Sequence, residues 1–219
     1  MKILFNDIIQ YSGADPALKS PALANRYAYG GTFAVSFDKE RPVDAIGIGN
    51  SDASVFEITF NEGTVFTFAF KGSGLYPMPK RINAESFTLQ TDADFIGRLA
   101  AGIGVEICTS VSKEPGFNST AEPRVTLSGQ VIEGRGGYTY RSLSLDSRYR
   151  ITREAIDEIA AGYKFIGMGY PFFINLEKEA YKLPYDKLYA EEKNQRQMRF
   201  EGGVFSYRYS RRWEFTERF

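Results

Sequence analysis

The middle of the chain alternates apolar and polar residues and then changes to a helical spacing. Val125, Leu127 and Val131 alternate with polar residues, and the glycine-rich run at 133–137 is typical of a reversal between strands. A second alternation places four apolar residues on one side of a strand: Leu143, Leu145, Tyr149 and Ile151. Thr152 can cap a helix whose apolar residues recur at i, i+3, i+4 and i+7, namely Ile156, Ile159, Ala160 and Tyr163. The pattern predicts a β-hairpin over 124–151 that leads into one amphipathic helix near 153–163.

The clearest hairpin of the first half lies over residues 56–70. Its two strands each carry three large apolar residues on one face, with a turn at Asn61–Gly63 between them: Phe56, Ile58 and Phe60, then Phe66, Phe68 and Phe70. Each buried phenylalanine contributes roughly 1.5–3 kcal/mol, so this face must be covered by a second layer. The hairpin therefore predicts a β-sandwich.

Shorter alternations and apolar runs predict further strands, over 33–37, 43–48 and 87–89, and a strand pair over 95–107. Residues 172–176 are continuously apolar, which predicts a buried strand. We expect turns at 38–42, 47–50 and 72–77, where charged residues, glycine and proline gather. The Gly-x-Gly at Gly47–Gly49 lacks the third glycine and the helix of a dinucleotide site, so we interpret it as a structural turn. Arg98 lies in a compact glycine- and alanine-rich segment, and we expect it to have a partner.

Proline, glycine and charged residues between Ser112 and Pro123 indicate a boundary between two halves. The predicted fold class is mainly β, with a β-sandwich over 1–112 and a β-rich domain with one amphipathic helix over 113–219. Residues 11–26 are interpreted as a loop or an extended arm.

The chain ends on an alternation of aromatic and basic residues over 205–219, which can either clamp nucleic acid or form a half-buried strand with a basic outer face. The net charge of zero favours the second interpretation.

Composition excludes several kinds of chemistry. None of the 219 residues is histidine, which excludes Ser-His-Asp and Cys-His catalysis and histidine-ligated metal sites. Cys108 is the one cysteine, so an internal disulfide or a thiolate cluster cannot form, and we interpret Cys108 as a small buried apolar residue. The 27 acidic residues balance the 27 basic ones, which argues against a general nucleic-acid binder.

Few residues are candidates for a reaction centre. Asp92 and Asp94 could hold a hard cation such as calcium, or could form a solvated turn, and the missing loop ligands favour the turn. A carboxylate pair of the glycosidase kind is open in principle, but nothing singles out one pair. P-loop and Gly-x-Ser-x-Gly motifs are absent, and Asn118–Thr120 matches a glycosylation acceptor by chance. We assign no catalytic, cofactor-binding or metal-binding residue, expect no cofactor, and expect that the protein is not an enzyme.

The sequence lacks the apolar run of roughly 20 residues that a membrane helix requires. Asn6 and Asp7 interrupt the first apolar residues too early for a secretory signal. We therefore interpret the chain as mature protein that is made and assembled in the cytoplasm.

Several phrases resemble structural proteins encoded among the tail and tail-tip genes of tailed bacteriophages: SGLYPM at 73–78, DADFIGRLAAG at 92–102, KEPGF at 113–117, the stretch 119–149, GYPFFINLEKE at 169–179 and LPYDKLYA at 183–190. Residues 30–110 also resemble a galactose-binding-like jelly roll, because residues 33–60 have that family's strand–turn–strand rhythm. The second half is similar in element order to the split-barrel domains of phage tail tubes and distal tail proteins. The resemblance implies a virion protein.

These observations lead to three hypotheses. The first is a structural component of a phage virion, in the tail or tail tip, that forms a homo-oligomer (a ring, trimer or hexamer) and contacts other phage tail proteins. We expect the arm at 11–26 and exposed strands at 204–219 to make those contacts. The second hypothesis is a carbohydrate-binding module that attaches to host-surface glycans. The third is a carboxylate-dependent hydrolase.

Overall fold

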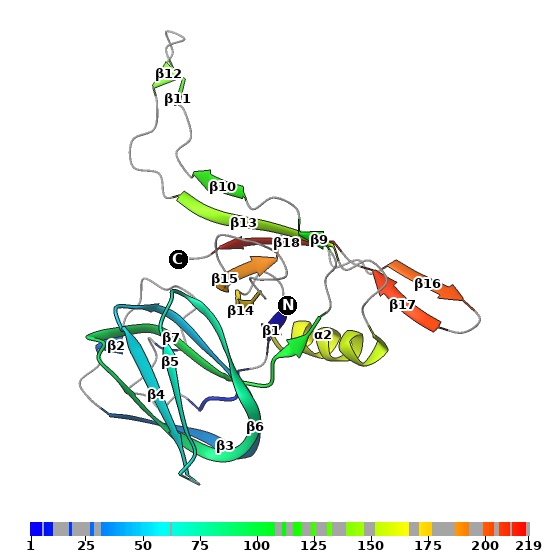
Figure 1. Ribbon diagram of the computed structural model, residues 1–219. Coiled ribbons are helices and arrows are strands. Elements are labelled where there is room, and N and C mark those ends of the chain that lie inside the picture. Colours follow the sequence, from blue (N-terminus) through cyan, green and yellow to red (C-terminus); the bar gives the residue numbers. More distant parts are fainter. Residues whose placement is uncertain are drawn as a thin grey trace.

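The protein is mainly β, as the alternation predicts, and its strands form antiparallel sheets (Figure 1). The computed structural model describes residues 1–5, 7–10, 18, 27–28, 32–61, 63–107, 111–112, 116–119, 124–125, 131–132, 139–146, 152–166, 171–176, 187–192, 199–203, 206–210 and 212–217.

One sheet folds over on itself to make a sandwich. Among the described residues its strand order is β2 (Tyr27–Ala28), β7 (Phe95–Gly102), β3 (Phe33–Ser51), β6 (Gly74–Thr91), β4 (Val55–Phe60) and β5 (Val65–Ala69). β3 and β6 are 19 and 18 residues long, and they pair at both of their ends. Between these ends the register shifts, so the sheet bends and its two halves face each other. The predicted hairpin is confirmed as β4 and β5, and Phe56, Ile58 and Phe60 are buried in the sandwich core.

Two turns predicted in the first half are wrong. Residues 38–42 and 47–49 lie inside the continuous strand β3. At 38–42 the strand passes through a register shift instead of reversing, and Gly47 and Ile48 pair regularly with Leu75 and Gly74 of β6. Gly74–Pro77 likewise begins the long strand β6, and only the residues before it turn. Asn50 has a φ of 44°, which places the change of direction at the end of β3.

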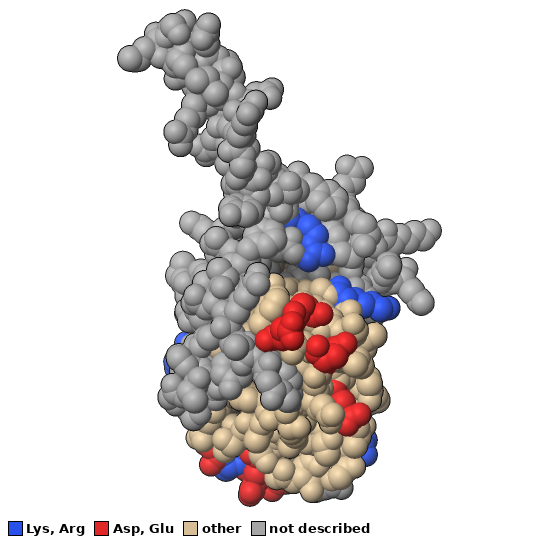
Figure 2. Space-filling view, turned by 90° about the vertical axis from the view of Figure 1, so that its left-hand side faces the viewer, with Lys and Arg blue, Asp and Glu red and all other residues tan. Residues whose placement is uncertain are grey.

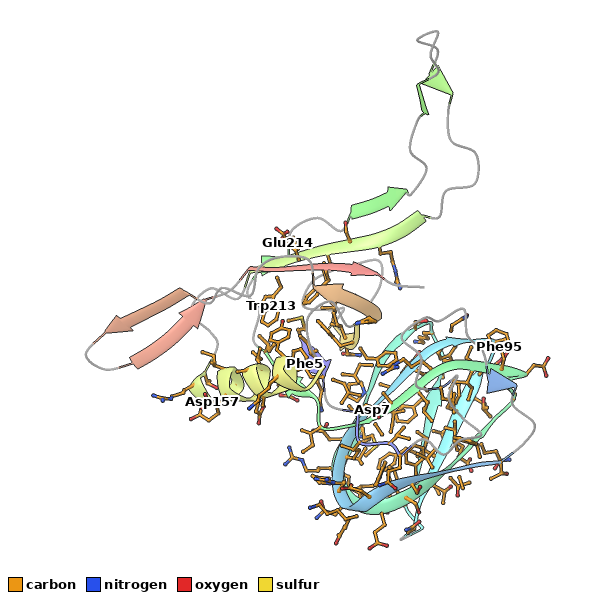
Figure 3. All side chains as sticks on the ribbon, turned by 180° about the vertical axis from the view of Figure 1, so that it is seen from behind. Phe5, Asp7, Phe95, Asp157, Trp213 and Glu214 are labelled. Carbon is orange, nitrogen blue, oxygen red and sulfur yellow. The ribbon has the colours of Figure 1, made fainter. Side chains whose placement is uncertain are left out.

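The second sheet joins both ends of the chain. Among the described residues it has eight strands in the order β10 (Gly116–Ser119), β13 (Thr139–Asp146), β18 (Arg212–Glu217), β15 (Lys187–Glu192), β14 (Phe172–Asn175), β1 (Lys2–Leu4) and β8 (Val105–Glu106), with β9 (Val111–Ser112) beside β13. Helix α2 (Arg153–Ile166) covers one face. In Figure 3, Trp213 points from β18 toward this covered face and Glu214 points to the other side. The strand β14 confirms the buried strand predicted at 172–176.

The predicted helix is confirmed, and its cap is as expected. The Ala155 N–H donates to Thr152 Oγ1 over 3.2 Å, and the Ile156 N–H donates to the Thr152 carbonyl over 3.1 Å. Ile159 and Tyr163 are buried against the sheet, but Ala160, which the spacing placed on the same face, is exposed. The neighbouring Gly162 is buried instead, because the ring of Phe5 packs directly on it.

The predicted hairpin over 124–151 is wrong in its pairing. β11 (Arg124–Val125) pairs with β12 (Val131–Ile132), whereas β13 pairs with β10, β18 and β9. The described part of β13 ends at Asp146, so Tyr149 and Ile151 lie outside the described residues. β1, β8 and β9 lie before residue 113 in the chain but join the sheet of the second half. The division of the chain at residue 112, and the likeness to a jelly roll and a split barrel, stay predictions.

Candidate assembly surfaces

The two sheets are joined by an apolar seam. Period two in each strand sends alternate residues to opposite faces. Thus Ile3 of β1 and Ile174 of β14 pack toward α2. The adjacent residues in the sequence, Leu4 and Phe173, lie on the opposite face, toward the other sheet. The seam consists of five buried residues from both sheets: Leu4, Ala45, Leu75, Ala100 and Phe173. Side chains therefore fill the space between the sheets in the described part of the chain.

Gly47 lets the two sheets approach this closely. A Cβ atom built on Gly47 would lie 2.2 Å from Cδ2 of Phe173, far inside van der Waals contact. The sequence signal was present, because a glycine within a strand often marks the close approach of another group. The interpretation of Gly47–Gly49 as a turn missed this role.

Polar contacts border the seam. The Lys2 ammonium lies 3.1 Å from Asp44 Oδ1, and the Gly104 N–H donates to the same oxygen over 2.8 Å. Arg81 approaches the other carboxylate oxygen at 3.8 Å. The side-chain amide of Asn175 donates to the Leu75 carbonyl over 3.1 Å. Both sheets contribute to these contacts, so the border fixes how they sit on each other.

Arg98 has the partner that its buried position requires. Its Nη2 lies 4.0 Å from Asp7 Oδ2, and both side chains are nearly buried. Asp7 Oδ1 also accepts hydrogen bonds from the N–H groups of Ile9 and Ala101, over 3.1 and 3.2 Å. The expectation for Arg98 is confirmed, and Asp7 ties the segment after β1 to the sandwich (Figure 3).

Two loop carboxylates at one end of the sandwich, those of Asp92 and Asp52, accept hydrogen bonds from backbone N–H groups. Asp92 Oδ1 accepts from the N–H groups of Ser54 and Val55, which hold the pKa of Asp92 below its usual range. Asp52 Oδ1 accepts from the N–H groups of Asp94 and Phe95. In the described part of the chain, no three histidine, cysteine or acidic residues are grouped as a metal site would need. This arrangement fits a turn at residues 92–94, the second of the two interpretations.

Figure 2 shows several carboxylates close together on the side of the sandwich that faces the viewer. The outer face of β5, β4 and the end of β6 carries one charged residue, Glu57. The others on that face are Val55, Thr59, Val65, Thr67, Ala69, Ser86, Thr88 and Gln90. Val55 and Val65 are 38% and 49% exposed.

The structure describes parts of the two segments, 204–219 and 11–26, that we expect to contact neighbouring proteins. β18 lies between β13 and β15, and Trp213 and Phe215 are buried, so residues 212–217 do not form an exposed strand. β17 (Ser206–Ser210) pairs with β16 (Arg199–Gly203). The arm at 11–26 lies outside the described residues except for Leu18, which is fully buried in the sandwich core. Cys108 also lies outside them.

Comparison of the chain with protein-family models, with curated proteins and with solved structures gives no match. Within the described residues, no helix is long and apolar enough to cross a membrane.

Proposed function

We propose that this chain is a structural component of a tailed-phage virion, in the tail or the tail tip. It works by assembling with copies of itself and with other tail proteins, after synthesis in the host cytoplasm. The observation that carries the proposal is the resemblance of its phrases to phage tail and tail-tip proteins, which runs through both halves of the chain.

The seam supports a structural role over a catalytic one. Ligand sites of two-lobed enzymes often lie between the lobes. Here that place is filled by the five seam residues, and the Lys2–Asp44 pair borders it. Close packing between the two sheets suits a protein that acts by holding its neighbours in place.

The test is the composition of purified phage particles. Particles from the source culture would be washed at high salt, banded by density and analysed by mass spectrometry, with an abundant host cytoplasmic protein as the control for carry-over. We expect the chain to band with intact tails at a fixed ratio to the other tail proteins, and the control to be lost. Absence of the chain from mature particles and from assembly intermediates, in cells that express it, would contradict the proposal. Binding of the purified chain to a glycan array would favour the carbohydrate-binding alternative.

A further inference from the structure

The strand β5 has one edge whose backbone groups point away from the sheet. The Phe70 N–H donates to the Ser54 carbonyl and the Phe60 N–H donates to the Thr64 carbonyl, which fixes the hydrogen-bonded pairs of the β4–β5 ladder. Bonded and non-bonded pairs alternate along an antiparallel ladder. The backbone groups of Phe66 and Phe68 therefore face β4, and those of Val65, Thr67 and Ala69 face outward. Within the described residues, the sheet order ends at β5.

This edge lacks the features with which proteins usually block strand pairing. Exposed edges normally carry charged residues or proline, or are covered or bulged. Residues 64–70 contain neither charge nor proline, and the pairing of β4 with β5 is regular from Val55 to Thr59. The face beside the edge carries one charge, Glu57, and depletion of charge is typical of the core of an interface.

The inner side of the same edge is apolar and incompletely covered. Phe66, Phe68 and Phe70 are only partly buried, although they pack against the sandwich core. Phe68 and Phe70 each contact Tyr76 with ring centroids 6.0 Å apart, and Phe66 contacts Phe60 at 6.1 Å. A strand added beside β5 would extend the sheet and cover these rings.

We propose that the occupant of this edge is β5 of a second copy of the chain, paired antiparallel about a two-fold axis at Thr67. In this register Val65 lies opposite Ala69 of the partner, and Thr67 lies opposite its own equivalent. All three outward residues then form bonded pairs, which gives about six backbone hydrogen bonds because each such pair exchanges two. A shift by two residues in either direction leaves only two such pairs.

The register also avoids repulsion between like charges. Lys71 of one copy faces Gly63 of the other, and the space beside Gly63 is open. The contact therefore brings no like charges together, and both copies present the same surface, as a closed two-fold interface requires. This pairing is independent of the virion proposal, since it follows from β5 alone.

The test measures mass in solution for variants at Thr67. In sedimentation velocity at about 0.1 mM, the native chain should have a mass about twice the 24.7 kDa of one chain. Thr67→Lys should weaken the dimer about tenfold or more, because two lysines would meet at the axis. Thr67→Pro should also weaken it, and it leaves the β4–β5 bonds intact because the lost N–H points outward. The matched control is Thr88→Lys, on the same outer face but on β6, which should leave the dimer unchanged.

Mixing two variants distinguishes a chain that cannot dimerise from a chain that cannot fold. Thr67→Lys and Thr67→Glu chains should each be monomers alone and form a mixed dimer when combined, since opposite charges then face each other. Hydrogen exchange should show the amides of Val65, Thr67 and Ala69 protected in the native dimer and released on dilution. A native chain that stays monomeric, an oligomer unaffected by both Thr67→Lys and Thr67→Pro, or pairing of β5 only with a different protein would overturn the proposal.

Discussion

Replacing Gly47 by alanine tests whether the seam holds the two sheets together. The added Cβ would lie 2.2, 2.6 and 2.7 Å from three ring atoms of Phe173. Carbon atoms in contact need about 3.5 Å, so the ring or the strand must move by roughly 1.3 Å. Phe173 is 2% exposed and is enclosed by the other seam residues, which leaves the ring little room.

The expected cost follows from two opposing effects. Overpacking a core costs about 1–3 kcal/mol, and alanine in a strand recovers about 0.5–1 kcal/mol relative to glycine. Because the enclosed ring of Phe173 cannot move far enough to relieve the clash, we expect Gly47→Ala to lower the free energy of unfolding by about 2 kcal/mol. Gly104→Ala is the matched comparison, since its Cβ would meet the flexible Lys2 stem, and we expect a smaller loss.

The assay is urea unfolding followed by the fluorescence of Trp213, the one tryptophan of the chain, which is fully buried. The double-mutant cycle adds Phe173→Leu, which removes the ring that the new methyl group would strike. We expect the loss caused by Gly47→Ala to shrink in that background, with a coupling energy of about 1–2 kcal/mol. An unchanged midpoint for Gly47→Ala, or the same loss in both backgrounds, would refute the reasoning.

Three further predictions concern single contacts. Thr152→Ala removes the oxygen that caps α2 and should cost about 1 kcal/mol, seen as a lower urea midpoint and as less helical signal in circular dichroism. Asp92 has a lowered folded-state pKa, so the stability it adds is present above its ordinary pKa of 3.8 and is lost as the pH falls through the folded-state value. Asp92→Asn should therefore flatten the decline of the urea midpoint in acid, and an unchanged slope would contradict this role. Lys2→Met should cost about 1–3 kcal/mol because the nearly buried Asp44 loses its closest cation, and Asp44→Asn in the same chain should recover part of the loss in thermal unfolding.

Elements whose pattern is complete within a few residues could be predicted from the sequence. The β4–β5 hairpin and α2 are of this kind, because Phe56–Phe60 and Ile156–Tyr163 carry their own periodicity, turn and cap. The strand β14 was also predictable, since both of its faces are buried and its sequence is continuously apolar.

Elements that depend on a distant partner could not be predicted in the same way. Asp38–Arg41 is as charged as a turn, but β3 pairs with β6 on both sides of the register shift, at Ser36 and at Arg41, so the strand continues through this stretch. Residues 212–217 have the alternation of an exposed strand, and only their place between β13 and β15 shows that they are interior. The candidate surface at β5 has the same limit, because the end of a sheet is a property of strand order and not of any one strand.

The position of β1 has a consequence for folding during synthesis. Its two neighbours, β8 and β14, leave the ribosome at very different times, since Lys2 pairs with Glu106 on one side and with Asn175 on the other. The sandwich strands β3 to β7 are complete well before Asn175 emerges, so they can form while one side of β1 is still open. Such late, long-range closure is slow. The nascent chain therefore carries an unpaired edge on β1 until Asn175 has emerged, and this edge is where a chaperone would act or where aggregation would start.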